Sequence, residues 1–252
     1  MTEIKRVVIG GIETDCVSSK DLVELLETPP STPGCKLLFD INGHGLALAL
    51  QDKRYRDDLR GADVIHADGQ PLVLASRVFT RSPIPERTAT TDLFHDVAAA
   101  AEHSGKTFFL LGGTEEVVQA CAQRMQELYP KLKIAGVRNG YFSQAEEEDV
   151  CRQINESGAD VIWVGLGKPK EQRFCIRNRD RITSGWLVTC GGCFNYVTGH
   201  YPRAPGWMQR HGLEWVHRMV TQPKKLAWRY LSTTPVALML LFLRTGDLKT
   251  QH

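Results

Sequence analysis

Four short apolar segments constrain the fold of this chain most strongly. They span residues 36–42, 64–68, 107–113 and 160–167, and glycine or polar residues follow each of them. Between the segments the apolar residues recur every three or four positions, as they do over 115–129, which predicts amphipathic helices. Strands that alternate with helices predict an α/β fold in which helices cover both faces of a parallel sheet. Ligands of such sheets bind beyond the carboxyl ends of the strands, so the residues that follow each strand are the candidate site.

Length and charge divide the chain into two parts. A chain of 252 residues predicts one large domain, or one domain with an appendage. The net charge of only +2 argues against a nucleic-acid-binding protein. Residues 203–252, however, contain eight Lys or Arg and only two Asp or Glu, so the rest of the chain is acidic. We therefore expect a body over residues 1–202 and a basic appendage over residues 203–252.

The cysteines and the N-terminus predict a cytoplasmic protein. The seven cysteines are odd in number and lie in apolar runs, and the first residues lack the pattern of a secretory signal. The longest strongly apolar run, 236–243, is far shorter than the roughly 20 residues that span a bilayer. Cys190 and Cys193 form a C-x-x-C motif without a second ligand pair at zinc spacing, so two small packed residues are the favoured interpretation and no metal site is expected.

Two predicted strand-to-helix turns contain glycines that allow a close approach to a phosphate. Gly112 and Gly113 stand at one turn, and Gly165 and Gly167 at the other. Backbone N–H groups at such turns, together with the helix N-terminus, favour a nucleotide diphosphate. Neither turn completes a dinucleotide or P-loop motif, and an ordinary glycine turn explains each of them equally well.

Several charged residues follow or flank the predicted strands. Asp68 ends the second strand, where its carboxylate could act as a general base; an ordinary Asp-Gly turn is the alternative. His66 lies on the same strand, and a packed or hydrogen-bonded histidine is favoured over a catalytic one. Arg87, Lys168 and Lys170 could neutralise phosphates, although a solvated side chain is the default for each.

The final fifty residues predict short helical pieces interrupted at Pro223 and Pro235, without a further strand. Three of the five tryptophans stand here, and residues 207–220 form a basic helix with apolar residues on one side. This pattern is typical of an element that lies in a membrane interface. Helices docked on the body with their charges in water are the alternative, but the apolar run 236–243 favours membrane contact.

Longer motifs follow one another along the chain. In order they are D-x-N at 40–42, ADVIHADG, ERTATTD, FFLLGG, GYF, VGLGKPKEQ, CGGCFNYVTGHYPRAP and GLEWVHRMVTQPKKLAWRYL. Together they resemble the WecG/TagA/CpsF family of bacterial glycosyltransferases. The resemblance implies transfer of a sugar from a UDP-sugar to a polyprenyl-diphosphate-linked saccharide in surface or exopolysaccharide biosynthesis.

The same resemblance implies a Rossmann-like core with a membrane-associating helical appendage, and an inverting mechanism that needs neither metal nor cofactor. It implies a peripheral protein on the inner face of the cytoplasmic membrane, in contact with anionic lipids, and leaves open whether the chain forms a homo-oligomer.

The resemblance also assigns residues by position. Asp68 matches the catalytic base, Asn42 a donor-site asparagine, and Arg87 and Asp92 the ends of an R-x-x-G-x-D segment. The other residues expected at the substrates are Asp40, Gly112, Gly113, Gly165, Gly167, Lys170, Glu171 and Gln172, with Arg203, Arg218, Lys225 and Arg229 at the lipid diphosphate.

Three positions depart from the family pattern. Asp40 replaces the usual threonine, Thr90 replaces a glycine, and Pro-Lys-Glu-Gln at 169–172 replaces Pro-Lys-Gln-Glu. Asp40 would repel an acidic sugar unless it is protonated or paired, or it could accept hydrogen bonds from sugar hydroxyls. The donor is therefore open among UDP-glucuronate, UDP-N-acetylmannosamine and a related UDP-hexose.

A second function class explains part of the same sequence. A non-catalytic scaffold that binds a nucleotide or a polyprenyl phosphate would use the glycine turns and the basic appendage equally well. Such a scaffold would give Asp68 no chemical role, so an assay of UDP release separates the two.

Overall fold

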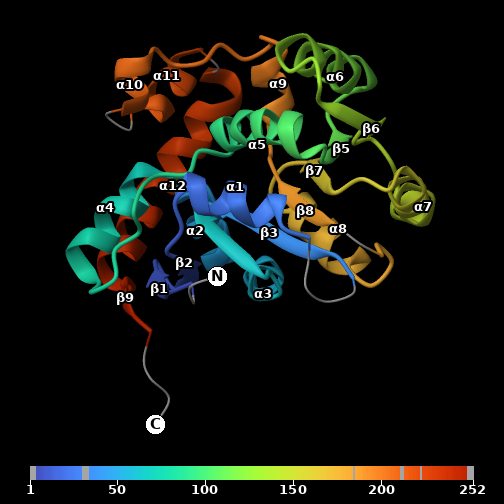
Figure 1. Ribbon diagram of the computed structural model, residues 1–252. Helices are drawn as coiled ribbons and strands as arrows, with labels where there is room; N and C mark the ends of the chain where they lie inside the picture. The colour runs from blue at the N-terminus through green and yellow to red at the C-terminus, as the bar shows by residue number, and fades with distance from the viewer. Residues whose placement is uncertain (1–3, 30–33, 184, 211–212, 222, 249–252) are drawn as a thin grey trace.

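The computed structural model describes residues 4–29, 34–183, 185–210, 213–221 and 223–248. A six-stranded parallel sheet lies at its centre, in the strand order β4-β3-β8-β7-β5-β6 (Figure 1). The strands are β3 (Lys36–Ile41), β4 (Val64–Ala67), β5 (Thr107–Gly112), β6 (Lys133–Arg138), β7 (Val161–Gly165) and β8 (Trp186–Thr189). The predicted Rossmann-like parallel sheet is therefore confirmed.

Helices cover both faces of this sheet because successive strand residues point to opposite sides. In β7, for example, Ile162 and Val164 belong to one hydrophobic core, and Val161 and Trp163 belong to the other. The first core is covered by α2 (Gly43–Gln51), α3 (Lys53–Arg60), α4 (Gln70–Phe79), α7 (Glu147–Ser157) and α8 (Lys170–Asn178). The second is covered by α1 (Ser19–Glu27), α5 (Thr90–Ser104), α6 (Glu115–Leu128) and α9 (Cys193–Val197).

A small antiparallel sheet joins the two ends of the chain. The strands β1 (Arg6–Ile9) and β2 (Ile12–Asp15) form a hairpin, and β9 (Gly246–Asp247) pairs with β1. Gly10 and Gly11 both have positive φ angles, of 58° and 90°, as the two-residue turn between the hairpin strands requires. The expectation of no strand after residue 203 is wrong, because a two-residue strand is too short to leave an alternating pattern.

The appendage consists of α10 (Gly206–Arg210), α11 (Glu214–Thr221) and α12 (Pro223–Leu243). The helix predicted over 207–220 is thus two helices; Gly212, which weakens a helical run, stands between them in the sequence and lies outside the described residues. Among the described helices, none is long and apolar enough to cross a bilayer.

The predicted break at Pro235 is also wrong, because α12 continues through it. Pro235 cannot bond the carbonyl of Leu231 four residues earlier, yet both residues lie on the exposed side of the helix, where water can replace that hydrogen bond. Pro223 is the first residue of α12, where the missing N–H of proline has no helical partner in any case.

The second half of α12 packs against the body. Ala237, Leu240 and Leu241 are buried, and α12 contacts α2 and α4. The exposed apolar side chains of α12 lie elsewhere on the helix, so one helix combines a docked side with an apolar side open to solvent. The docked alternative therefore holds for the buried side of α12, and membrane contact of the appendage stays a prediction. In Figure 1, α10 and α11 stand away from the central sheet at the upper left.

Candidate active site

A cavity of about 620 Å³ opens at the carboxyl ends of the parallel strands. Its walls come from the turns after the strands of the body and from α11 and α12 of the appendage. Of the predicted residues, Asp40, Asn42, Asp68, Arg87, Gly113, Gly165, Gly167, Lys170, Glu171, Arg218 and Arg229 line it. Gly112, Asp92, Gln172 and Arg203 are described but do not line it, and the side chain of Lys225 lies outside the described residues.

Asp68 follows β4 and presents a carboxyl group to the cavity. The Arg87 guanidinium lies 3.7 Å from this carboxylate, and no group among the described residues donates a hydrogen bond to it. Burial raises the pKa of Asp68 to about 7, although Arg87 acts in the opposite direction and Asp40 adds to the increase. A carboxyl group that titrates near neutral pH is suited to accept a proton from a hydroxyl group.

His66 lies two residues earlier, inside the sheet, and is fully buried. Its Nδ1 atom is 2.7 Å from the hydroxyl of Thr88. Burial lowers the pKa of His66 to about 4, so the ring is neutral at physiological pH. The interpretation of His66 as a packed, hydrogen-bonded histidine is confirmed.

Asp40, at the end of β3, is held in a buried ion pair with Lys168. Thr189 donates a hydrogen bond of 3.1 Å to the Asp40 carboxylate. Burial by itself would raise the pKa of Asp40, but the Lys168 cation, His66 and the hydrogen bonds from Lys168 and Thr189 together hold it below its ordinary value. Of the states considered for Asp40, the structure therefore gives the paired one.

Glu171 extends the same buried network. Its carboxylate accepts hydrogen bonds from the backbone N–H groups of Gly167 at 2.9 Å and Gly191 at 3.0 Å, and lies 3.8 Å from Lys168. Burial raises its pKa to about 7. The amide of Gln172, fully buried, donates to Glu171 at 3.3 Å. The sequence departures at 40 and at 171–172 thus form one cluster around Lys168.

Asn42 caps the N-terminus of α2, and its side chain accepts a hydrogen bond from the backbone N–H of Gly45 at 3.1 Å. Its amide nitrogen lies 3.5 Å from the Asp40 carboxylate. The N-cap bond orients the side chain, so the remaining amide group is held at the cavity wall beside Asp40.

The glycine turns of β5 and β7 approach each other closely. A Cβ atom on Gly112, which has a φ of +146°, would lie 2.3 Å from the carbonyl oxygen of Gly165. Gly112 is therefore required for packing between the turns, while Gly113, Gly165 and Gly167 form part of the cavity wall. Because glycine has no side chain, the backbone groups at these positions are accessible to a ligand.

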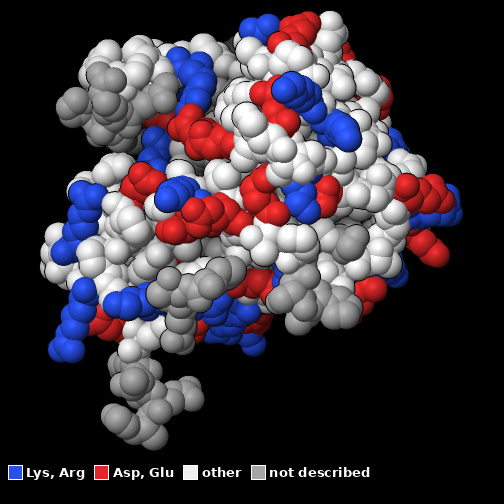
Figure 2. Space-filling model, in the orientation of Figure 1, with Lys and Arg blue, Asp and Glu red and all other residues white. Residues whose placement is uncertain are grey.

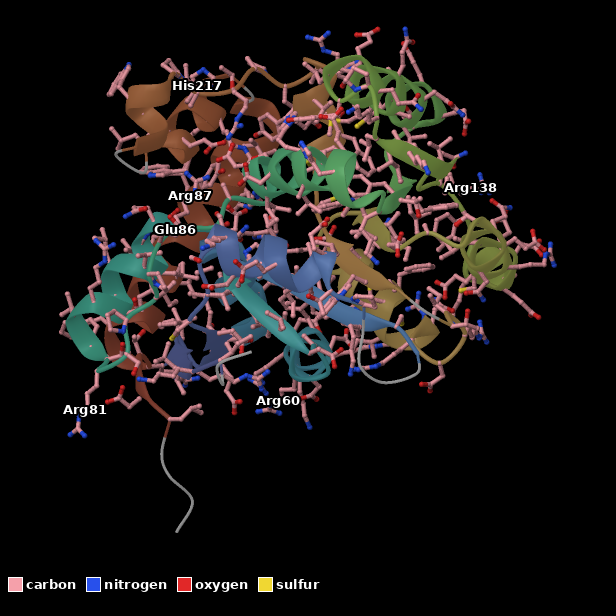
Figure 3. All side chains as sticks on the ribbon, in the orientation of Figure 1. Arg60, Arg81, Glu86, Arg87, Arg138 and His217 are labelled. Carbon is pink, nitrogen blue, oxygen red and sulfur yellow. The ribbon has the colours of Figure 1, made fainter. Side chains whose placement is uncertain are left out.

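Two ion pairs join the appendage to the body, and one of them lies at the cavity wall. Glu214 of α11 accepts a hydrogen bond of 2.8 Å from Arg87, and Arg203 pairs with Asp92 at 2.7 Å. Arg87 thus lies between Asp68 and Glu214, and Figure 3 shows it between α4 and the helices α10 and α11. Sequence reasoning missed Glu214, although it is one of only two acidic residues after position 202.

Arg218 and Arg229 bring positive charge from the appendage into the cavity. Their guanidinium groups lie over the rings of Tyr196 and Tyr230, at 5.4 and 5.2 Å from the ring centroids. The Nε atoms of both arginines are buried without a hydrogen-bond partner, and no carboxylate among the described residues forms an ion pair with either. These two side chains are therefore available to an anionic ligand.

The sequence is similar to those of known proteins. The model of the glycosyl transferase WecG/TagA/CpsF family matches residues 7–251. Two relatives are named N-acetylglucosaminyldiphosphoundecaprenol N-acetyl-beta-D-mannosaminyltransferase. The protein from Bacillus subtilis (strain 168) is 32% identical and that from Bacillus spizizenii is 31% identical, each over 74% of this chain and 71% of the relative. The chain belongs to the WecG/TagA/CpsF family of glycosyltransferases.

Proposed function

We propose that this member of the WecG/TagA/CpsF family transfers a sugar from a UDP-sugar to a saccharide carried on a polyprenyl diphosphate. The acceptor class follows the names of the two Bacillus relatives. The single observation that carries the proposal is Asp68, whose carboxyl group faces the cavity, accepts no hydrogen bond from the described residues and has a pKa raised to about 7.

The donor would occupy the side of the cavity formed by the β5 and β7 turns. Gly113 and Gly167 offer backbone there, and Lys170 brings a positive charge at the start of α8. Tyr141, exposed at the cavity wall, provides a ring on which a base could stack. A nucleotide diphosphate placed over these turns would direct its sugar towards Asn42 and Asp40, nearer to Asp68.

The transfer itself would be a single displacement with inversion. Asp68 takes the proton of the acceptor hydroxyl while that oxygen forms a bond to the anomeric carbon. The bond from the anomeric carbon to the UDP oxygen breaks, and UDP leaves with the electron pair. The charge that develops on UDP would be met by backbone N–H groups and by side-chain cations in the place that a divalent metal takes in other transferases.

The lipid-linked acceptor would approach from the appendage. Arg218 and Arg229 would hold its diphosphate, because both line the cavity with a buried, unpaired Nε atom and no described carboxylate forms an ion pair with either. A diphosphate anchored in a bilayer requires the protein to work at the membrane surface. We therefore infer a peripheral position on the inner face of the cytoplasmic membrane, where anionic lipids attract the basic appendage.

The pairing of Asp40 bears on the choice of donor sugar. Because Lys168 already neutralises Asp40 and contacts Glu171, this cation is not free for a sugar carboxylate. The Asp40 oxygens can accept hydrogen bonds from hydroxyl groups. We therefore expect UDP-N-acetylmannosamine or a neutral UDP-hexose to be a better donor than UDP-glucuronate.

A transfer assay tests the proposal. The chain would be incubated with each of the three donors and a short-chain polyprenyl-diphosphate-linked N-acetylglucosamine, and UDP release and the anomeric configuration of the product would be measured. Asp68→Asn should lower the rate by about 10³-fold, because it removes the general base, while UDP still binds. Asp57→Asn, at an exposed carboxylate of α3, is the matched control and should remain active.

The same assay identifies the alternative. If the wild-type chain releases no UDP with any donor and acceptor but binds UDP or the lipid diphosphate, the non-catalytic scaffold is the better account. If Asp68→Asn turns over at a rate close to that of the wild type, the assignment of the base is wrong.

A further inference from the structure

Helix α4 belongs to the body, yet its outer side is apolar. Leu72 and Val73 point into the core, whereas Leu74 and Val78 are 51% and 72% exposed. These two residues are four positions apart and therefore lie on the same side of the helix. Phe79, at the end of α4, is exposed as well. Exposed apolar side chains grouped in this way mark a contact surface.

The appendage continues this apolar surface. The ring of Phe242, near the end of α12, packs edge-on against Phe79 with the ring centroids 5.7 Å apart. Phe242 remains 70% exposed despite this contact, and its neighbours Met239 and Leu243 are exposed too. Residues more than 150 positions apart in the sequence thus form one surface, which we call the α4–α12 face: Leu74, Val78, Phe79, Met239, Phe242 and Leu243.

Basic side chains surround the α4–α12 face. Arg77 lies in the last turn of α4, Arg81 follows α4, Arg244 follows α12, and all three are exposed. The side chain of Arg81 is 95% exposed and points away from the molecule in Figure 3. Figure 2 shows positively charged side chains at the left edge of the molecule around an uncharged surface over α4. An apolar surface with a basic rim is complementary to a bilayer with anionic headgroups.

The same two helices reach the cavity. Gln70 and Pro71, at the start of α4, line it, as do Leu238 and Leu241 of α12. The α4–α12 face is therefore formed by the same two helices that line the cavity. A polyprenyl chain whose diphosphate is bound in the cavity could leave between these helices and enter the lipid beside them.

We propose that helix α4 of the body, together with the end of α12, inserts into the surface of an anionic bilayer. Membrane binding would then use the body as well as the basic appendage, and Leu74 and Val78 would enter the interface. The direction of the lipid path rests on the proposed function, whereas the binding of α4 to a bilayer does not. Insertion at this face would fix the orientation of the cavity relative to the membrane.

Vesicle sedimentation with the full chain tests this proposal. The probes are phosphatidylcholine vesicles with and without phosphatidylglycerol. We expect stronger binding to the anionic vesicles, and we expect Val78→Asp to reduce that binding about ten-fold or more, because it replaces an inserted apolar group with a charge. Leu128→Asp, at a 45% exposed leucine of α6 on the other side of the sheet, is the matched control and should bind as the wild type does.

A second variant and a second measurement keep the result decisive. Leu74→Asp should reproduce the loss, and both α4 variants should retain the wild-type circular dichroism and transfer to a water-soluble acceptor. Wild-type binding by both variants would overturn the proposal. So would light scattering that reveals a dimer which Val78→Asp dissociates without affecting vesicle binding, since a second copy would then cover this face.

Failure of this proposal and of the proposed function are distinguishable. A chain that binds vesicles through α4 but transfers no sugar would contradict only the enzymatic function. A chain that transfers sugar normally while Val78→Asp and Leu74→Asp bind vesicles as the wild type does would contradict only the role of α4.

Discussion

The two regions that form the cavity differ in how their charges are neutralised. In the body, the cation Lys168 is buried between Asp40 and Glu171, and every partner in this cluster is part of the fold. In the appendage, Arg218 and Arg229 lie over tyrosine rings, and no described carboxylate pairs with either. In the body, Lys168 thus lowers the pKa values of Asp40 and Glu171 against the effect of burial. In the appendage, the charges of Arg218 and Arg229 are available for an anionic ligand.

The comparison also separates stability from binding. Breaking a buried ion pair leaves an unpaired charge in the protein interior and destabilises the fold. Removing a cation that has no protein partner leaves the fold largely intact and affects the ligand instead. We therefore expect the largest effects where a buried charge loses its partner and the smallest at exposed ion pairs.

Lys168→Met should lower the free energy of unfolding by about 3–5 kcal/mol, because Asp40 and Glu171 lose their cation while they remain buried. Urea unfolding monitored by tryptophan fluorescence measures the change. The double variant Asp40→Asn with Lys168→Met should recover most of the loss. A double variant no more stable than Lys168→Met would show that the ion pair is not the origin of the effect.

Arg218→Gln and Arg229→Gln should each raise the KM for the lipid-linked acceptor about 10- to 100-fold, as expected for the loss of a charge-assisted hydrogen bond of about 1.5–3 kcal/mol. Their free energies of unfolding should change little. Arg60→Gln, on the exposed side of α3, is the control. An increase confined to the KM of the UDP-sugar would assign these arginines to the donor rather than to the acceptor.

The ratio kcat/KM should rise with pH and reach its midpoint near pH 7, because Asp68 must be ionised to accept a proton and burial raises its pKa to about 7. Glu214→Gln should move this limb to lower pH by about one unit, since Arg87 would then interact with Asp68 without a competing carboxylate. An unchanged profile would disconnect the appendage from the titration of Asp68.

Whereas kcat/KM should rise with pH, the contribution of Asp68 to the free energy of unfolding should fall with pH. Because the pKa of Asp68 is higher in the folded chain than the ordinary 3.8, the contribution of Asp68 to stability is complete below about pH 4 and is lost as the pH rises through 7. Asp68→Asn should therefore remove this part of the pH dependence of unfolding.

Asp92→Asn should change the free energy of unfolding by less than about 1 kcal/mol, because the Asp92 side chain is 50% exposed and its pair with Arg203 lies at the surface. The resemblance assigns Asp92 to the substrate, but the residue does not line the cavity. We expect an unchanged KM for the UDP-sugar. A ten-fold increase in this KM would restore the substrate role of Asp92.

Local patterns predicted the parallel sheet and the edge at which the site lies. Alternating and helical periodicities extend over only a few residues, so 107–113 and 115–129 are recognisable without knowledge of the rest of the fold. The same reasoning selected Asp68 and His66 from the end of one strand, and the packed state of His66 is confirmed. The same reasoning failed at Pro235. Helix α12 tolerates this proline because it lies on the exposed side of the helix, and only the folded structure shows which side is exposed.

Only the tertiary structure decided which charges meet. Lys168 and Asp40 are 128 positions apart, and Arg87 and Glu214 are 127 positions apart. No local pattern connects such residues, because their proximity depends on the order of the strands in the sheet and on the docking of α12 against α2. The sequence alone determined that a carboxylate stands at the functional edge. Burial and long-range partners, which exist only in the folded chain, decided that Asp40 is paired with Lys168 and that Asp68 titrates near neutral pH.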